Sequence, residues 1–224
     1  MAIQAGSDIQ SGSVSAFLPR VLGIGTFAVM QALNGMATGD EYTVTDVGPV
    51  RMRFVYGPAV WRPMGVQILR SVASDISSAA DTTEQILDSF ALPAKLLALD
   101  AYVLRCSLAY EKTLGNSTSI RLRLGTTGTT ADASLNISSS GFISTSTGKS
   151  GGMIVYLKRA SSTTIKSIGG GGSAGWTNSS STGGLAVSTV GNFDSANQYL
   201  SLTQSNASSD IIKITGWIVE LMPA

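Results

Sequence analysis

The feature that most constrains this chain is an alternation of apolar and polar residues that recurs in short segments along its length. It is clearest in residues 101–110, where five residues share one face: Tyr102, Leu104, Cys106, Leu108 and Tyr110. A period of two residues is typical of a β-strand with one side in a core and the other toward solvent. No long helical pattern follows residue 36, so the sequence predicts an all-β protein.

Other segments with the same pattern, rich in β-branched and aromatic residues, predict further strands. They cover residues 41–46, 50–56, 66–69, 86–91, 120–124, 153–157, 185–190, 199–203 and 211–221. Gly216 interrupts the last of them, and we expect a bulge there that switches the buried face. Residues 125–140 and 161–184 are dominated by Gly, Ser, Thr and Asn and predict polar loops. Many short strands between such loops indicate an antiparallel sandwich or jelly roll.

One short helix is expected near the N-terminus, between residues 26 and 36. Thr26 is a candidate N-cap and Gly35 a candidate stop, while Phe27, Met30 and Leu33 share one face at helical spacing. The sequence thus predicts three parts: an N-terminal arm (residues 1–20), a small β connector module with the helix (21–80) and a jelly-roll-like antiparallel β-sandwich head (81–224).

The chain carries little charge, and this restricts its partners. Its net charge is +1, and 13% of its residues are charged, against about 25% in an ordinary soluble domain. Nucleic acid and anionic membranes are bound by a clustered positive excess, so neither is expected as a partner. The most apolar stretch, residues 21–30, is too short for membrane insertion, which needs about 20 apolar residues. Burial against copies of the same chain explains the low charge and predicts an oligomer.

The residue types argue against catalysis. Histidine is absent and Cys106 is the single cysteine, which removes the commonest general base, the commonest metal ligand and any internal disulfide. Cys106 lies among apolar strand neighbours, where a buried small side chain is a simpler interpretation than a reactive thiol. Paired carboxylates can hydrolyse a glycosidic bond, yet the acidic residues are scattered. We expect no enzymatic activity, no catalytic residues, no metal and no cofactor.

Aromatic residues in the polar stretches are the candidates for recognition. Phe142 and Trp176 lie within Ser- and Gly-rich sequence, and Tyr199 opens a strand. Aromatic side chains in such places suit stacking on sugars or flat contacts with proteins. The alternative is that they fill the rim of the core or a subunit interface. Both interpretations stay open for each of the three residues.

The N-terminal part of the chain resembles a known virion module. Residues 39–48 (GDEYTVTDVG) are followed by FVYG at 54–57 and WRP at 61–63. This series resembles a small module of tailed-bacteriophage fibre and virion-surface proteins, in which a strand of this pattern precedes a short strand and a Trp-Arg-Pro turn.

The C-terminal part resembles the jelly-roll heads that follow that module. A strand ending in LPA at 92–94 leads to residues 101–110 and to IRLRLG at 120–125, and the chain closes with IKITGWIVE at 212–220. Together the two parts extend the resemblance over most of the chain beyond residue 20. The shared pattern consists of strands and turns and contains no catalytic signature.

The resemblance implies a homotrimer on a virion, with an N-terminal attachment region and a distal head. The first hypothesis is a short trimeric tail fibre whose polar loops bind a glycan or protein on the host surface. The alternative is a capsid cement or head-fibre protein, gripping the shell through the arm and the helix residues Phe27, Met30 and Leu33. Other virion proteins of the tail, baseplate or capsid are partners in both. A third hypothesis, a glycan-degrading tailspike enzyme, lacks a catalytic signature.

Overall fold

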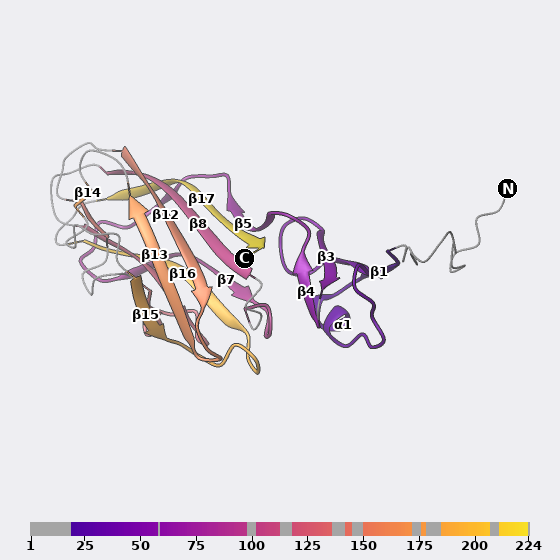
Figure 1. Cartoon of the computed structure of the whole chain (residues 1–224). Helices are drawn as coiled ribbons and strands as arrows, with labels where there is room; N and C mark the ends of the chain where they lie inside the picture. The colour runs from indigo at the N-terminus through magenta and orange to yellow at the C-terminus, as the bar shows by residue number, and fades with distance from the viewer. Residues whose placement is uncertain are drawn as a thin grey trace, which may run out of the picture.

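A small N-terminal module and a larger β-sandwich head make up the computed structural model (Figure 1). The described residues are 19–57, 59–97, 102–112, 118–135, 142–144, 150–171, 176–177, 185–206 and 211–223. Nearly all regular structure is β, as the sequence predicts. Within the described residues, no helix has the length and apolar character required to cross a membrane.

The module is one sheet with a short helix on it. Its elements are β1 (Val21–Gly25), α1 (Phe27–Gln31), β2 (Glu41–Val44), β3 (Met52–Gly57) and β4 (Val60–Pro63). The strands follow one another in the order β1-β2-β3-β4. β1 and β2 are parallel, because α1 carries the chain back across the sheet, and the other two pairs are antiparallel. Trp61-Arg-Pro63, which the sequence analysis expected to be a turn, lies in β4.

Helix α1 begins where expected but is shorter than predicted. The Thr26 hydroxyl accepts a hydrogen bond from the Val29 N–H at 3.2 Å, which confirms Thr26 as the N-cap. Asp46 Oδ1 accepts the Phe27 N–H at 2.7 Å, so a second side chain satisfies the first turn. The helix ends at Gln31, and the N–H of the C-cap residue Ala32 is shared between the carbonyls of Ala28 and Val29, as is common at helix ends.

An ion pair between the half-exposed Arg20 and the buried Asp40 joins the start of the module to its sheet. Asp40 is 2% exposed and accepts hydrogen bonds from Arg20 Nε at 3.0 Å and Arg20 Nη2 at 2.5 Å. The Ala37 N–H adds a third at 2.8 Å. The hydrogen bonds from Arg20 outweigh the cost of burial and lower the pKa of Asp40 to about 2. Arg20, expected at the end of the arm, therefore belongs to the module.

The head consists of two facing sheets. Its strands are β5 (Gln67–Val72), β6 (Ile76–Ser77), β7 (Gln85–Leu92), β8 (Tyr102–Lys112), β9 (Thr118–Gly125), β10 (Ala133–Ser134), β11 (Phe142–Ser144), β12 (Ser150–Arg159), β13 (Thr164–Gly171), β14 (Trp176–Thr177), β15 (Leu185–Thr189), β16 (Gln198–Asn206) and β17 (Ile212–Pro223). One sheet has the order β15-β13-β12-β8-β17-β5, with β6 also on β17, and we call it the large sheet. The other has the order β14-β11-β9-β16-β7, with β10 also on β9, and we call it the small sheet.

The strand pairing is that of a jelly roll. β5 pairs with β17, β7 with β16, β8 with β12 and β9 with β11, all antiparallel. The first strand of the head thus pairs with the last, and the pairs that follow are nested inside, as in a long antiparallel hairpin folded over on itself. β13 and β15 widen the large sheet and β14 widens the small one. The predicted jelly-roll-like head is therefore confirmed.

Two expectations about the head need correction. Its first strand is β5, so the head begins near residue 67, well before the predicted boundary at residue 81. The partner of β5 is the last strand of the chain, and a local pattern does not reveal so distant a pairing. The predicted polar loop 161–184 contains β13, with Gly169–Gly171 opposite Val155–Met153. Because glycine has no side chain, this part of the strand shows no alternation of apolar and polar residues in the sequence.

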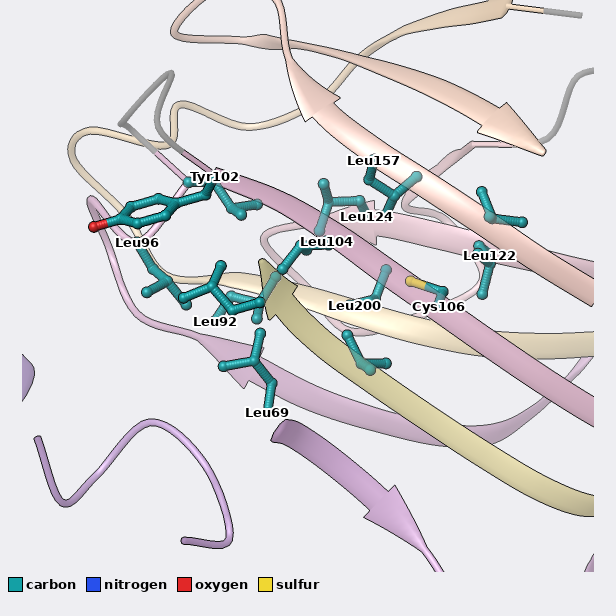
Figure 2. Packing of buried hydrophobic residues seen from close by; sticks show 14 of the residues in the cluster. Leu69, Leu92, Leu96, Tyr102, Leu104, Cys106, Leu122, Leu124, Leu157 and Leu200 are labelled. Carbon is teal, nitrogen blue, oxygen red and sulfur yellow. The ribbon is translucent and has the colours of Figure 1, made fainter. Parts of the chain in front are cut away.

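Leucines from both sheets fill the core of the head. In Figure 2, Leu104 and Cys106 of β8 lie across from Leu122 of β9 and Leu200 of β16. These four side chains are 1% exposed or less. Burial raises the pKa of the Cys106 thiol, so the cysteine behaves as a small apolar residue, as the sequence indicates.

The bulge expected at Gly216 is present and changes the buried face of β17. The register against β8 shifts between Ile214 and Gly216. Before the shift Ile214 is buried, and after it Trp217 and Val219 are buried. Trp217 Nε1 then donates to Asp88 of the small sheet at 2.9 Å. Arg70 of β5 also binds Asp88, at 2.6 and 3.0 Å, so one carboxylate ties two strands of the large sheet to the small one.

The module packs directly on the head. The Tyr102 hydroxyl of β8 donates to the Trp61 carbonyl of β4, and the Tyr102 ring meets that of Phe54 edge-on, with centroids 6.4 Å apart. At Gly48 the two parts approach so closely that a Cβ would lie 2.4 Å from the Ile68 carbonyl oxygen. The module is thus a fixed base at one end of the head.

Acid is expected to destabilise the module through Asp40. Its pKa is about 2 in the folded chain, below the ordinary 3.8, so its stabilisation is present above pH 3.8 and is lost as the pH falls toward 2. Asp40→Asn should lower stability at neutral pH and remove this acid step, as measured by fluorescence-monitored unfolding across pH. Asp194→Asn is the control, since the carboxylate of Asp194 is 46% exposed. An unchanged acid step in Asp40→Asn would contradict the assignment.

Gly48→Ala should separate the module from the head. The added methyl group meets backbone, which cannot move aside as a side chain does. We therefore expect the free energy of unfolding to fall by about 1–3 kcal/mol and the module to pack less closely on the head. Small-angle scattering measures the radius of gyration, and denaturant unfolding reports the stability. Val50→Ala is the control, since Val50 lies two residues from Gly48 and is 55% exposed, so its change removes little packing. Equal scattering from the two variants would count against a close fit at Gly48.

Candidate functional site

The aromatic residues predicted to recognise a ligand lie in two places. Phe142 is in β11 opposite Ile120 of β9, and Trp176 is in β14 opposite Ser144 of β11. The structure thus brings the strands of Phe142 and Trp176 side by side, although their side chains lie outside its described part. Tyr199 pairs with Gly125, five residues along β9 from Ile120, a separation of roughly 17 Å. Tyr199 is therefore not part of the same surface.

Strands β11 and β14 form an edge of the small sheet that we call the distal edge. In Figure 1, β14 lies at the end of the head farthest from the module. Tyr102, which contacts the module, begins β8, and the other end of β8 leads toward Thr118, the first residue of β9. Because β11 pairs with Thr118–Ile120, the distal edge lies away from the module.

A polar surface adjoins the distal edge on the outer side of the small sheet. Leu122 and Leu200 point into the core, so the residues between the buried positions of β9 and β16 point outward. We call this group of residues the polar face, and it comprises Glu84, Ser89, Arg121, Arg123, Ser201, Thr203 and Ser205. Ser201 and Thr203 are fully buried within it, and the side chains of Glu84, Arg121 and Arg123 are 19%, 16% and 14% exposed. Arg121 directly follows Ile120, the partner of Phe142, so the polar face and the distal edge are continuous.

Glu84 organises the polar face. Its two oxygens accept hydrogen bonds from Arg123 Nε and Nη2, both at 2.7 Å. The Thr203 hydroxyl donates to the same carboxylate at 2.5 Å, and Arg121 Nη1 lies 3.5 Å from it. Burial raises the pKa of Glu84, but the hydrogen bonds from Arg123 and Thr203 and the two guanidinium charges lower it further, so the pKa lies below its usual value.

Further hydrogen bonds fix the arginines and hydroxyls in place. Arg121 Nη1 also donates to Ser205 Oγ at 2.9 Å, and Arg123 Nη1 donates to the Asp132 carbonyl at 2.6 Å. The hydroxyls of Ser89 and Ser201 are 2.9 Å apart. Two guanidinium groups share one carboxylate, so these three groups carry a net charge of +1. The exposed part of the two fixed guanidinium groups suits contact with a carboxylate-bearing or hydroxyl-bearing ligand.

The stretch that follows β9 is an ordered turn built on one aspartate. Asp132 accepts hydrogen bonds from the Thr127 hydroxyl and the Gly128 N–H, each at 2.7 Å. A Cβ at Gly128 would lie 3.2 Å from two atoms of the Tyr199 ring, so the turn rests on Tyr199. This contact gives Tyr199 a packing role at the module end of the sheet, the alternative that the sequence left open.

The helix residues proposed for virion attachment lie in the module core. Phe27 is 2% exposed and Met30 is fully buried, and the Phe27 ring meets Phe54 at 6.0 Å. Leu33 is partly buried against the same core. These side chains stabilise the module and are not available as contact surface. Exposed apolar residues near them are Val21, Ile24 and Val29, which are 73%, 54% and 51% exposed.

The sequence carried a signal for only part of this site. The alternation in residues 120–124 places Arg121 and Arg123 opposite the apolar side chains. The role of Glu84 depends on the pairing of β9, β16 and β7, which local sequence does not specify. Among the described residues, no group of three potential ligands from Asp, Glu and Cys is arranged to hold a metal ion.

Comparisons with known proteins give weak structural matches. The chain matches no protein-family model, and its sequence matches no curated protein. Among solved structures, it is similar to the CBM2 module of the evolved Dit protein of Lactobacillus casei BL23 phage J-1, with a TM-score of 0.31, 8% identity and coverage of 61% of this chain and 69% of that one. A chain of infectious bursal disease virus Gx strain has a TM-score of 0.29 and 11% identity, and 81% of this chain covers about half (49%) of that one. At these scores the matches carry no functional inference.

Glu84→Gln should disrupt the polar face. The change leaves two largely buried guanidinium groups without their shared charge, and we expect a loss of about 2 kcal/mol or more in unfolding free energy. Denaturant unfolding measures it. Glu41→Gln is the control, because its partner Arg53 is 59% exposed and such pairs contribute under about 1 kcal/mol. Similar losses in the two variants would show that Glu84 does not organise this surface.

Proposed function

We propose that the chain is a structural component of a phage virion, a short trimeric fibre whose head adheres to the host surface. The module would attach to other virion proteins, and the distal edge with the polar face would bind a surface glycan or protein. The proposal rests on the sequence resemblance to phage fibre modules and heads. The observation that carries it is the placement of the two candidate surfaces at opposite ends of one chain (Figure 1).

The attachment end is supported by exposed apolar side chains. Val21 and Ile24 of β1 and Val29 of α1 project from the module, next to the point where the arm joins it. β1 is also an outer strand of its sheet, and outer strands offer main-chain groups to a partner strand. A partner that covers these residues would remove apolar surface from water without disturbing the buried Phe27 and Met30.

The adhesion end is supported by the chemistry of its residues. The partly exposed guanidinium groups of Arg121 and Arg123 lie beside strands that contain Phe142 and Trp176. Glycan recognition combines polar contacts with stacking on aromatic rings. Weak binding by each head would be strengthened by several heads on one virion. We propose that the chain does this without enzymatic turnover, metal or cofactor. Release of sugars from host polysaccharide by the purified protein would overturn that part.

The same attachment surface fits a second function, a capsid cement or head-fibre protein that stabilises the shell. In that case the module is the working part and the polar face is secondary. Gold-labelled antibodies on intact virions separate the two functions by electron microscopy. Label at the tail tip or baseplate supports the fibre, and label spread over the capsid supports the decoration protein. Heating shells with and without the protein then tests whether it stabilises them.

Replacing both Phe142 and Trp176 by Ala should weaken binding to host cells while the mass of the oligomer stays the same. We expect a loss of roughly thirtyfold per head, because each of the two aromatic contacts contributes about 1 kcal/mol beyond its buried area. Tyr199→Ala is the control, since Tyr199 lies at the other end of the small sheet. Cell binding of labelled protein measures the effect. Unchanged binding by the double variant, or an equal loss in Tyr199→Ala, would contradict the assignment of the distal edge.

A further inference from the structure

The outer side of the large sheet carries a row of exposed apolar residues. Ile154 of β12 and Ile218 of β17 are 42% and 38% exposed and flank Ser107 of β8 in one row across the sheet. An outer sheet face in contact with water normally alternates to polar residues. Here large apolar side chains stand out on the two strands beside β8. We call Ile154, Ser107 and Ile218 the ridge.

A shallow trough lies directly beside the ridge on the same three strands. The next row consists of Gly152, Ala109 and Gly216, paired across β12, β8 and β17. These residues have no side chain beyond a methyl group, so the surface drops next to the ridge. The resulting open hollow has a volume of about 400 Å³, and Ile154 and Ile218 line it. A ridge and a trough of equal length therefore lie side by side.

The charges beside the ridge cancel within the chain. In the row on its other side, Arg105 and Glu220 form a two-point ion pair, with hydrogen bonds of 2.6 and 2.8 Å. Tyr156 and Ile68 flank this pair, each 38% exposed. Burial of the surface would consequently leave no charge in these rows without its partner, which is the usual obstacle to burying charged residues.

We infer that this surface is the contact between copies of this chain, with the ridge of one copy seated in the trough of the next. A copy of the same surface supplies both the required shape and the required neutrality. In the trimer of the proposed function, the ridge of each copy would meet the trough of one neighbour and its trough the ridge of the other, the head-to-tail type of contact that forms closed rings. The low charge of the whole chain, 13% of its residues, agrees with a large self-contact. The inference rests on the oligomer in the proposed function and identifies its interface.

Sedimentation of the full chain with two variants and a control tests the inference. Wild type should sediment as three copies of the 23.1 kDa chain. Ile218→Arg should sediment as a monomer, because it places a charge without a partner in the contact. Ile86→Arg is the matched control, since Ile86 is 41% exposed on β7 of the other sheet, and it should keep the wild-type mass. Circular dichroism checks that each variant is folded.

Ala109→Leu distinguishes a contact that depends on shape complementarity from nonspecific hydrophobic association. Ala109 is exposed, so the change leaves the core intact and adds apolar surface. Nonspecific hydrophobic association predicts that the variant associates more strongly. A ridge seated in the trough predicts association weaker by roughly tenfold or more, because the leucine fills the space that the ridge occupies. This variant keeps the test valid even if Ile218→Arg does not fold.

Four results would each overturn the inference: a monomeric wild type, an unchanged mass for Ile218→Arg, dissociation of Ile86→Arg, or tighter association of Ala109→Leu. The experiment does not measure cell binding. A failure of the adhesion proposal and a failure of this interface are therefore seen in different assays.

Discussion

The hydrogen-bonded position of β17 between β8 and β5 is the constraint on which the head depends. The last strand of the chain is the inner neighbour of the outer strand of the large sheet, with β8 along one side and the first strands of the head, β5 and β6, along the other. It also carries Trp217 to Asp88 of the small sheet. Without β17, β5 and β6 would have no partner in the large sheet, and one side of β8 would lose its hydrogen bonds.

Local sequence was sufficient to identify most strands but not their partners. Alternation in residues 101–110 and 211–221 reflects one face in a core, a property that each strand has by itself. The assignment of β5 to the head depends on the end of the chain, and β13 was missed because Gly169–Gly171 have no side chains that could alternate. The bulge at Gly216 was predictable, because a glycine interrupting a strand marks the change of face directly.

The sequence likewise identified some residues of the candidate site but not the contacts between them. Phe142 and Trp176 stood out in polar sequence, and their strands do lie together, whereas Tyr199 stood out equally and packs under a turn. The arginines of the polar face follow from alternation, but Glu84 joins them only because β7, β16 and β9 are neighbours. In the module, Phe27 and Met30 followed the helical period because they form the core. Periodicity therefore identifies packing better than contact surfaces.

The single thiol has a use that follows from its position. Cys106 lies at the centre of β8, between the two sheets, and is fully buried. A thiol reagent can reach it only when the sandwich opens, and the chain has no other cysteine to add background. The rate at which the native protein is labelled therefore measures how often the head opens. The labelling rate also reports the stability of the head within an assembled particle. Calorimetry of such a particle would measure the unfolding of all its components together.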